Sequence, residues 1–319
     1  MDISYLLFLQ DFRNSIDNAL TPFFESVSYI AISYNIIIPV LLYWCLNKRF
    51  GLFAFAGYTA GLALNALVKL TACIYRPWIR DSRVLPAGDA IRTATGYSFP
   101  SGHTSRATGI YGACAWAFWQ NKKTRFVSIL LGLLIVLTGF SRNYLGVHTP
   151  QDVLVAFTLM TLVLLGMWKL FAFVEAHPEK ENLFLLGGIL FAFLGLCFIN
   201  FKSYPMDYVD GKLIVDPKKM MIDGHGDIGI FVGFCIGRFI EKKWVRFEAT
   251  GLNAKGIALF VLGLIPFFLM NKFLPLVLNS IFSKAWAQFT LQGLLIFYII
   301  LLWPIVIKLV TNKTHKTEN

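Results

Sequence analysis

Charged residues are scarce in this chain of 319 residues. They make up 15% of it, whereas about a quarter is usual in soluble domains. The five cysteines stand singly, with no CxxC pair and no Cys/His cluster, which argues against a zinc site and against a disulfide framework. Internal repeats and low-complexity tracts are also missing, so repeat and disordered architectures are not indicated.

A cleavable signal peptide is not evident either. Charged residues interrupt the first 24 residues, at Asp2, Asp11, Arg13 and Asp17. Such a segment lacks the uninterrupted apolar centre of a signal peptide. We expect residues 1–25 to form an amphipathic helix at the membrane interface, with residues 5–9 (YLLFL) on its apolar side.

Long apolar runs are abundant, since hydrophobic residues make up 56% of the chain. Nine runs approach the roughly 20 residues that a spanning helix needs. They lie at about 26–46, 51–70, 101–119, 126–141, 151–173, 183–201, 227–240, 255–271 and 287–310. The expected fold is an all-α polytopic transmembrane bundle, with a core at 26–175 and additional helices at 176–319.

Basic residues cluster in the short connectors 47–49 and 121–125. Because short basic loops prefer the cytoplasm, this predicts an N-terminus outside and a C-terminus inside. The net charge of +11 has no aromatic-interleaved patch of the kind that binds nucleic acid. Anionic lipids and anionic substrates are therefore the expected partners. Of the two long outer loops, 71–100 and 202–226, the second has a hairpin signal at Asp210-Gly211.

Polar residues that suit phosphate chemistry occur at the ends of these runs. Lys69 ends the second run, and Arg76 follows just before Pro77. Two cations here suit a phosphate group, although snorkelling at the interface is the favoured explanation when they are taken alone.

A second cluster, Pro100-Ser101-Gly102-His103, opens the third run. The free N–H groups of a helix start attract anions. Gly102 allows close approach of an oxyanion, and His103 is placed to donate a proton. The alternative is an ordinary capped helix start.

The third cluster is Ser141-Arg142, His148 and Asp152. Thr149-Pro150 with Asp152 makes a good helix start, which by itself would explain the acid. The catalytic interpretation is that the Asp152 carboxylate orients the His148 ring so that its other nitrogen can attack. By the count of spans, all three clusters return to one membrane face, which favours a shared site over three coincidences.

Together the clusters resemble the three-part signature of the type 2 phosphatidic acid phosphatase (PAP2) superfamily. The resemblance covers residues 69–152 and includes every signature position. It implies that phosphate is bound by Lys69, Arg76, Ser101, Gly102 and Arg142. It also implies that His148 is the nucleophile, Asp152 its partner and His103 the general acid, with no metal or cofactor.

The substrate stays open at this point. Two leading spans, an outer N-terminus and nine spans are similar to glucose-6-phosphatase, whereas residues 96–99 (GYSF) are similar to bacterial lipid-type members. We expect a phosphatase for lipid phosphates or polyprenyl (pyro)phosphates at the extracytoplasmic face. A phosphatase or phosphotransferase for a soluble sugar phosphate is the alternative within enzymes, and a transporter or scaffold the alternative outside them.

Arg106, one turn inside His103, carries a charge within the third run. An unpaired charge there is costly. It either contacts a second anionic group of the substrate or pairs with a buried acid, and the sequence leaves both open.

Overall fold

The computed structural model describes residues 2–94 and 96–317, and most of them are helical. The first half forms α1 (Asp2–Ser15), α2 (Thr21–Ser33), α3 (Ile37–Leu41), the π-helical turn η1 (Leu42–Leu46), α4 (Lys48–Ala72), α5 (Pro77–Arg80), the 3₁₀ turn η2 (Ala90–Thr93), α6 (Gly102–Trp119), the 3₁₀ turn η3 (Lys122–Thr124) and α7 (Arg125–Tyr144). The second half forms α8 (Pro150–Ala176), the 3₁₀ turn η4 (Pro178–Lys180), α9 (Glu181–Phe201), β1 (Tyr208–Val209), β2 (Lys212–Leu213), α10 (Pro217–Ile240), the π-helical turn η5 (Glu241–Val245), α11 (Ala254–Ile281), α12 (Lys284–Phe297), the π-helical turn η6 (Tyr298–Leu302) and α13 (Trp303–Thr317). The predicted all-α class is confirmed. Met1 and residues 318–319, at the ends of the predicted ranges 1–25 and 176–319, lie outside the described residues.

Eight helical segments of the described chain are long and apolar enough to cross a membrane. They are Thr21–Leu46, Lys48–Arg80, Lys122–Tyr144, Pro150–Ala176, Pro178–Phe201, Pro217–Val245, Ala254–Ile281 and Lys284–Asn312. The chain is therefore an integral multi-pass membrane protein. Of the nine predicted spans, only residues 101–119 are not among these segments, because their mean hydropathy is too low.

These residues form α6, a helix of 18 residues. Its Ser, Thr and Gly residues, with His103 and Arg106, lower its hydropathy. Because α6 packs against α4, α7 and α8, much of its polar surface faces protein rather than lipid. A helix inside a bundle does not need a lipid-compatible surface, which is why composition alone undercounts it.

Several predicted boundaries were wrong, including the end of the eighth segment, which is Ile281 rather than residue 271. The first spanning segment begins at Thr21 rather than residue 26, and the seventh begins at Pro217 rather than residue 227. Asp216 caps α10 by accepting a hydrogen bond from the Lys218 N–H, and Pro217 occupies the first turn. The helix thus starts ten residues before its apolar run, within the predicted outer loop. The predicted hairpin is present, because Tyr208 pairs with Leu213 across a turn in which Asp210 and Gly211 have positive φ.

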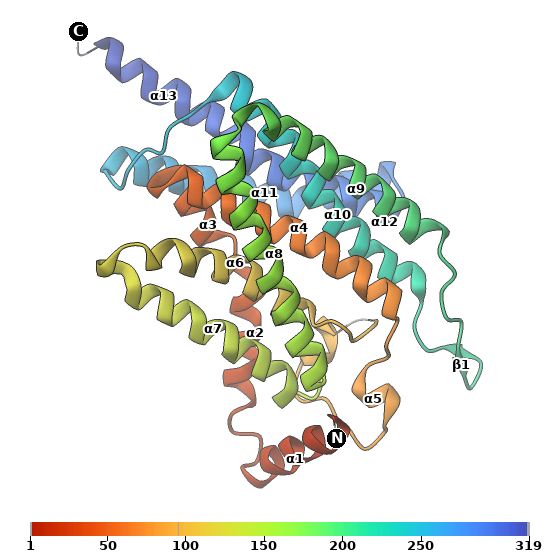
Figure 1. The fold of residues 1–319 in the computed structure, drawn as a ribbon. Helices are drawn as coiled ribbons and strands as arrows, with labels where there is room; N and C mark the ends of the chain where they lie inside the picture. The colour runs from red at the N-terminus through yellow and green to blue at the C-terminus, as the bar shows by residue number, and fades with distance from the viewer. Residues whose placement is uncertain (1, 95, 318–319) are drawn as a thin grey trace.

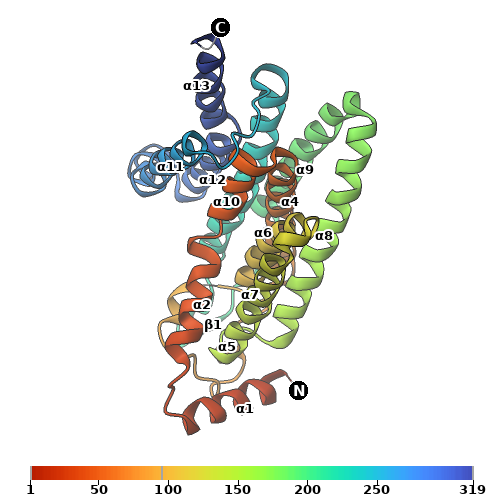
Figure 2. The same ribbon diagram turned by 90° about the vertical axis from the view of Figure 1, so that its left-hand side faces the viewer.

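The bundle is built around α4 and α10. α4 packs on α6, α8 and α10, and α10 packs on α4, α9 and α12 (Figures 1 and 2). Small residues allow α10 and α12 to approach closely. A Cβ built on Gly233 would lie 2.2 Å from the Gly293 carbonyl oxygen, so no larger residue fits there without a backbone shift.

Helix α1 lies across one end of the bundle, at the opposite end from the C-terminus (Figure 1). Leu6 and Leu9 are buried, whereas Phe8 is 66% exposed. The Arg13 guanidinium donates to the carbonyls of Leu85 and Tyr144 at 2.8 and 3.0 Å. A helix is therefore present in the predicted N-terminal segment and is tied to the loops beside the site described next, but it ends at Ser15 rather than residue 25. Its place at the membrane interface stays a prediction.

Candidate active site

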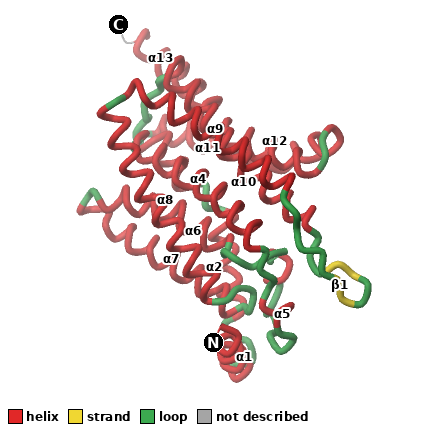
Figure 3. Tube along the Cα trace, turned by 45° about the vertical axis from the view of Figure 1, so that its right-hand side comes forward, coloured by secondary structure: helices red, strands yellow, loops and turns green. Residues whose placement is uncertain are grey.

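The three polar clusters meet at the end of the bundle that carries α1 and α5. Figure 3 shows loop segments gathered beside α5 at this end. The chain after α4, the start of α6 and the α7–α8 connection each bring one cluster to it. The predicted convergence is confirmed by direct contacts between residues 70 or more positions apart, such as Arg76 with His148.

His148 and Asp152 form the centre of the site, and both are at most 2% exposed. The Nδ1 atom of His148 lies 3.3 Å from Asp152 Oδ2. The same carboxylate oxygen accepts hydrogen bonds from Ser98 Oγ at 2.5 Å and from the Thr149 N–H at 2.8 Å. The Asn143 amide holds the His148 backbone by donating to its carbonyl at 2.9 Å. Because Thr149 also caps α8 through the Asp152 N–H, the helix start fixes the carboxylate and with it the ring.

Arg76 and Asp152 together determine which tautomer His148 adopts. Its Nη1 lies 2.8 Å from His148 Nε2. A guanidinium can only donate, so Nε2 must be the accepting, unprotonated nitrogen. The ring hydrogen is then on Nδ1, which faces Asp152. This is the tautomer in which Nε2 carries a lone pair, which here accepts the hydrogen bond from Arg76.

The pKa of His148 is held well below its usual range, first by burial and then by the positive charge of Arg76. The imidazole is therefore neutral near pH 7. A neutral ring is what a nitrogen nucleophile requires.

Arg142 has hydrogen-bond donors left over. It is 1% exposed, and its Nη1 donates to Ser28 Oγ at 2.6 Å. Its Nε and Nη2 are buried and have no hydrogen-bond partner among the described residues. Buried unsatisfied donors of a charged group are costly, and an anion bound beside His148 would satisfy them.

Ser101 is the N-cap of α6, and its side chain accepts from the Thr104 N–H at 3.4 Å. A Cβ built on Gly102 would meet no atom within 4 Å, so there is open space beside the first turn. His103 and Arg142 both line a cavity of about 470 Å³ between α2 and the turn at residues 89–93. The proton donor and the phosphate-binding cation predicted from the sequence thus face one space.

Lys69 contributes charge rather than free donors. Its ammonium group donates to the carbonyls of Tyr97, Ser98 and Pro100, at 3.3, 3.2 and 2.5 Å. An ammonium group has three hydrogens, so these bonds use all of them. Lys69 therefore holds the loop that leads into α6, and its charge lies next to the backbone carbonyls of that loop.

Arg106 pairs with an acid, which is the second of the two roles that the sequence leaves open. Its Nη2 lies 2.7 Å from Asp227 Oδ1 of α10, and its Nη1 donates to the Tyr58 hydroxyl at 3.1 Å. A direct contact with substrate, the first role, stays a prediction.

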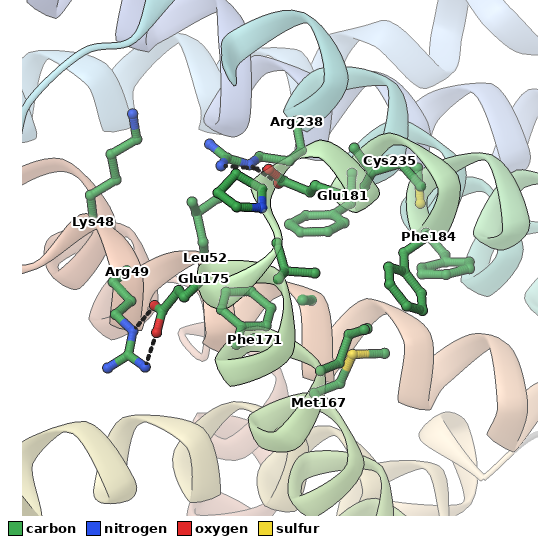
Figure 4. Close-up of a pocket in the computed structure, with 17 residues that line it drawn as sticks. Lys48, Arg49, Leu52, Met167, Phe171, Glu175, Glu181, Phe184, Cys235 and Arg238 are labelled. Carbon is green, nitrogen blue, oxygen red and sulfur yellow. Dashed lines mark hydrogen bonds and ion pairs between the residues drawn. The ribbon is translucent and has the colours of Figure 1, made fainter. Parts of the chain in front are cut away.

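A larger cavity, of about 610 Å³, lies at the other end of α4, between α4, α8, α9 and α10 (Figure 4). Its walls are mainly apolar, and the charged groups at its rim pair with one another, as Arg49 does with Glu175 and Arg238 with Glu181. Neither histidine of the site lines it. His103 and Arg142 line the smaller cavity instead.

Sequence reasoning missed Ser98, Asn143 and Ser28 as supporting residues. Ser28 and Ser98 act on partners 114 and 54 positions away, so no spacing rule connects them with the site. Within the described part of the chain, no group of three His, Cys, Asp or Glu residues is arranged to hold a metal ion.

Comparison with known proteins identifies the family. The model of the PAP2 superfamily matches residues 50–175, and the model described as "PAP2 superfamily phosphatase, transmembrane extension" matches residues 226–314. No solved structure matches the chain.

Several curated bacterial proteins are similar to the chain. Phosphatidylglycerophosphatase B of Bacillus subtilis is 34% identical over 121 residues, which is 36% of this chain and 55% of that protein. Undecaprenyl-diphosphatase BcrC of Bacillus subtilis is 30% identical over 142 residues, 44% of this chain and 68% of that protein. Phosphatidylglycerophosphatase B of Escherichia coli K12 is 38% identical over 76 residues, 23% of this chain and 29% of that protein. The chain thus spans about half the length of the first of these relatives and two thirds of the second, and it belongs to the PAP2 superfamily.

Proposed function

We propose that this protein is a membrane phosphatase that hydrolyses lipid phosphates through a phosphohistidine at His148. One observation carries the proposal. Arg76 and Asp152 fix the neutral His148 ring with its lone pair on Nε2, beside the two buried, unpartnered donors of Arg142. A nucleophile and an anion site are thus prepared together.

The geometry supports a two-step reaction. In the first step His148 Nε2 attacks phosphorus, the bond to the leaving oxygen breaks, and His103 gives that oxygen a proton. Burial and the charge of Arg142 lower the pKa of His103, and the negative charge of a bound phosphate offsets them. Arg76, Arg142 and the Lys69 charge stabilise the oxygens around phosphorus, where negative charge is concentrated. In the second step water attacks phosphorus, His103 takes a proton from the water, and the bond between phosphorus and Nε2 breaks, so phosphate leaves and His148 is restored.

A lipid substrate is supported by the position of the cavity and by the relatives. Tyr29 and Ile30 of α2 line the cavity beside His103 and are 57% and 45% exposed on the membrane-spanning segment. An alkyl chain could therefore stay in the hydrocarbon while its phosphate enters. The names of the relatives refer to phosphatidylglycerophosphate and undecaprenyl diphosphate, which are both lipid phosphates.

A phosphate-release screen in proteoliposomes tests the proposal. We expect turnover of lipid phosphates in the presence of a chelator, competition by vanadate, and no comparable turnover of sugar phosphates. His148→Ala should abolish turnover and leave expression and thermal stability near those of the wild type. Activity on sugar phosphates alone would contradict the lipid proposal, and unchanged turnover by His148→Ala would contradict the mechanism.

A further inference from the structure

Helix α10, from the part of the chain that follows the catalytic core, forms one wall of the site. Met220 packs against the loop before α6, where its sulfur accepts from the Tyr97 N–H at 3.3 Å. A Cβ built on Gly224 would lie 2.9 Å from a methyl group of Leu70, the neighbour of Lys69. Asp227 pairs with Arg106 of α6 at 2.7 Å. Residues 220, 224 and 227 share one face of a helix, so this face of α10 is turned toward the site.

Asp223 lies on the edge of the same face, one turn from both Met220 and Asp227. Its side chain is exposed, and it has no hydrogen bond or ion pair within the described residues. Its carboxylate nevertheless interacts electrostatically with Arg106, Lys69 and Arg76. The group is thus an open negative charge beside the cations of the phosphate site.

The charge balance shows what this carboxylate does. The cations are Lys69, Arg76, Arg106 and Arg142, and the carboxylates are Asp152, Asp223 and Asp227. Two of the three carboxylates come from α10, so this helix reduces the positive charge that the core residues present.

We propose that Asp223 is a specificity-determining residue that makes the site favour phosphate monoesters over diphosphates. This inference rests on the function proposed above. A diphosphate brings at least one more negative charge than a monoester of the same alcohol, and Asp223 repels that additional charge. Between two unit charges in a partly solvated site, such repulsion corresponds to a factor of about three to ten in binding.

The test compares two substrates that share one alcohol, farnesyl phosphate and farnesyl diphosphate. Consumption of each is followed at its initial rate by wild type, Asp223→Asn, Asp223→Glu and the control Asp210→Asn. Asp210 is an exposed acid in the hairpin turn, where asparagine is equally tolerated, so the control makes the same chemical change away from the site.

We expect Asp223→Asn to raise kcat/KM for the diphosphate relative to the monoester by about three- to tenfold. The shift should shrink as ionic strength rises, because salt screens an exposed charge. Asp223→Glu and Asp210→Asn should leave the ratio unchanged. An unchanged ratio of the two kcat/KM values in Asp223→Asn, or an equal shift in Asp210→Asn, would overturn the inference. Wild-type turnover of lipid phosphates in the same experiment would still support the proposed phosphatase. Absence of wild-type turnover on every lipid phosphate would overturn both.

Discussion

At the scale of single residues, the site depends on one carboxylate oxygen that serves three partners. Asp152 Oδ2 lies within hydrogen-bond reach of His148 Nδ1, Ser98 Oγ and the Thr149 N–H. The oxygen therefore orients the ring and also caps the helix that carries it. Catalytic geometry and local folding are coupled here through a single atom.

Asp152→Asn tests this coupling. An amide can turn its NH₂ group toward His148 Nδ1, which would move the ring hydrogen to Nε2 and remove the attacking lone pair. We expect kcat to fall by about 10³- to 10⁴-fold, as in a triad that loses its orienting carboxylate. Binding of vanadate, measured by calorimetry, should persist because Arg76 and Arg142 remain.

Ser98→Ala is the matched control, since it removes one donor to the same oxygen and keeps the carboxylate. It should cost much less activity than Asp152→Asn. Equal losses in the two variants would mean that the hydrogen-bond network, rather than the tautomer, limits the rate.

The residues that the sequence predicted and those that it missed differ in a physical way. His148 and Asp152 are four positions apart at a helix start, so local geometry makes their contact predictable. Arg76 was predicted as a phosphate ligand, but its contact with His148, 72 positions away, depends on the tertiary fold. The same holds for Asp227, a partly buried acid, because the sequence allowed an acidic partner for Arg106 without identifying it.

At the scale of secondary structure, hydropathy located the helices but not the ends of those that carry function. α6 and α10 both begin with polar residues, and both of these beginnings border the site. Apolar runs mark where a helix contacts lipid, whereas polar helix ends are stabilised by caps and by neighbouring helices. The predicted start was therefore wrong by the most residues for α10, and the first turns of this helix border the site.

The α10–α12 contact gives a prediction at this scale. A Cβ on Gly233 would meet the backbone of Gly293, which cannot move as a side chain can. We expect Gly233→Ala to destabilise the protein by about 1–3 kcal/mol, as overpacking does elsewhere. Thermal unfolding in detergent measures the loss.

Gly187→Ala in α9 is the control, because a Cβ there meets no atom within 4 Å. It should be neutral or slightly stabilising, since alanine favours helix over glycine. Equal destabilisation by both substitutions would contradict close packing of α10 against α12 as the cause.

At the scale of the whole molecule, the catalytic residues and the basic connectors lie at opposite ends of the bundle. The catalytic cluster lies at the end with α1, and the basic connectors at 47–49 and 121–125 follow the spans toward the other end (Figure 1). If α6 crosses the membrane with the other eight segments, the two ends of the chain fall on opposite sides. The basic connectors then predict a cytoplasmic C-terminus and an extracytoplasmic active site.

Single cysteines test this orientation in a variant whose five native cysteines have been replaced. Lys212 lies in the hairpin beside the catalytic end and Lys122 in a basic connector, and both side chains are exposed. We expect Lys212→Cys to react with a membrane-impermeant maleimide in intact cells. Lys122→Cys should react only after permeabilisation, because it faces the cytoplasm.

The reverse pattern would place the active site on the cytoplasmic face, and labelling of both positions in intact cells would contradict an odd number of crossings between them. Since the contacts among Arg76, Arg142 and His148 do not depend on the sidedness of the bundle, the reverse pattern would change the leaflet from which substrate is drawn and leave the proposed chemistry intact.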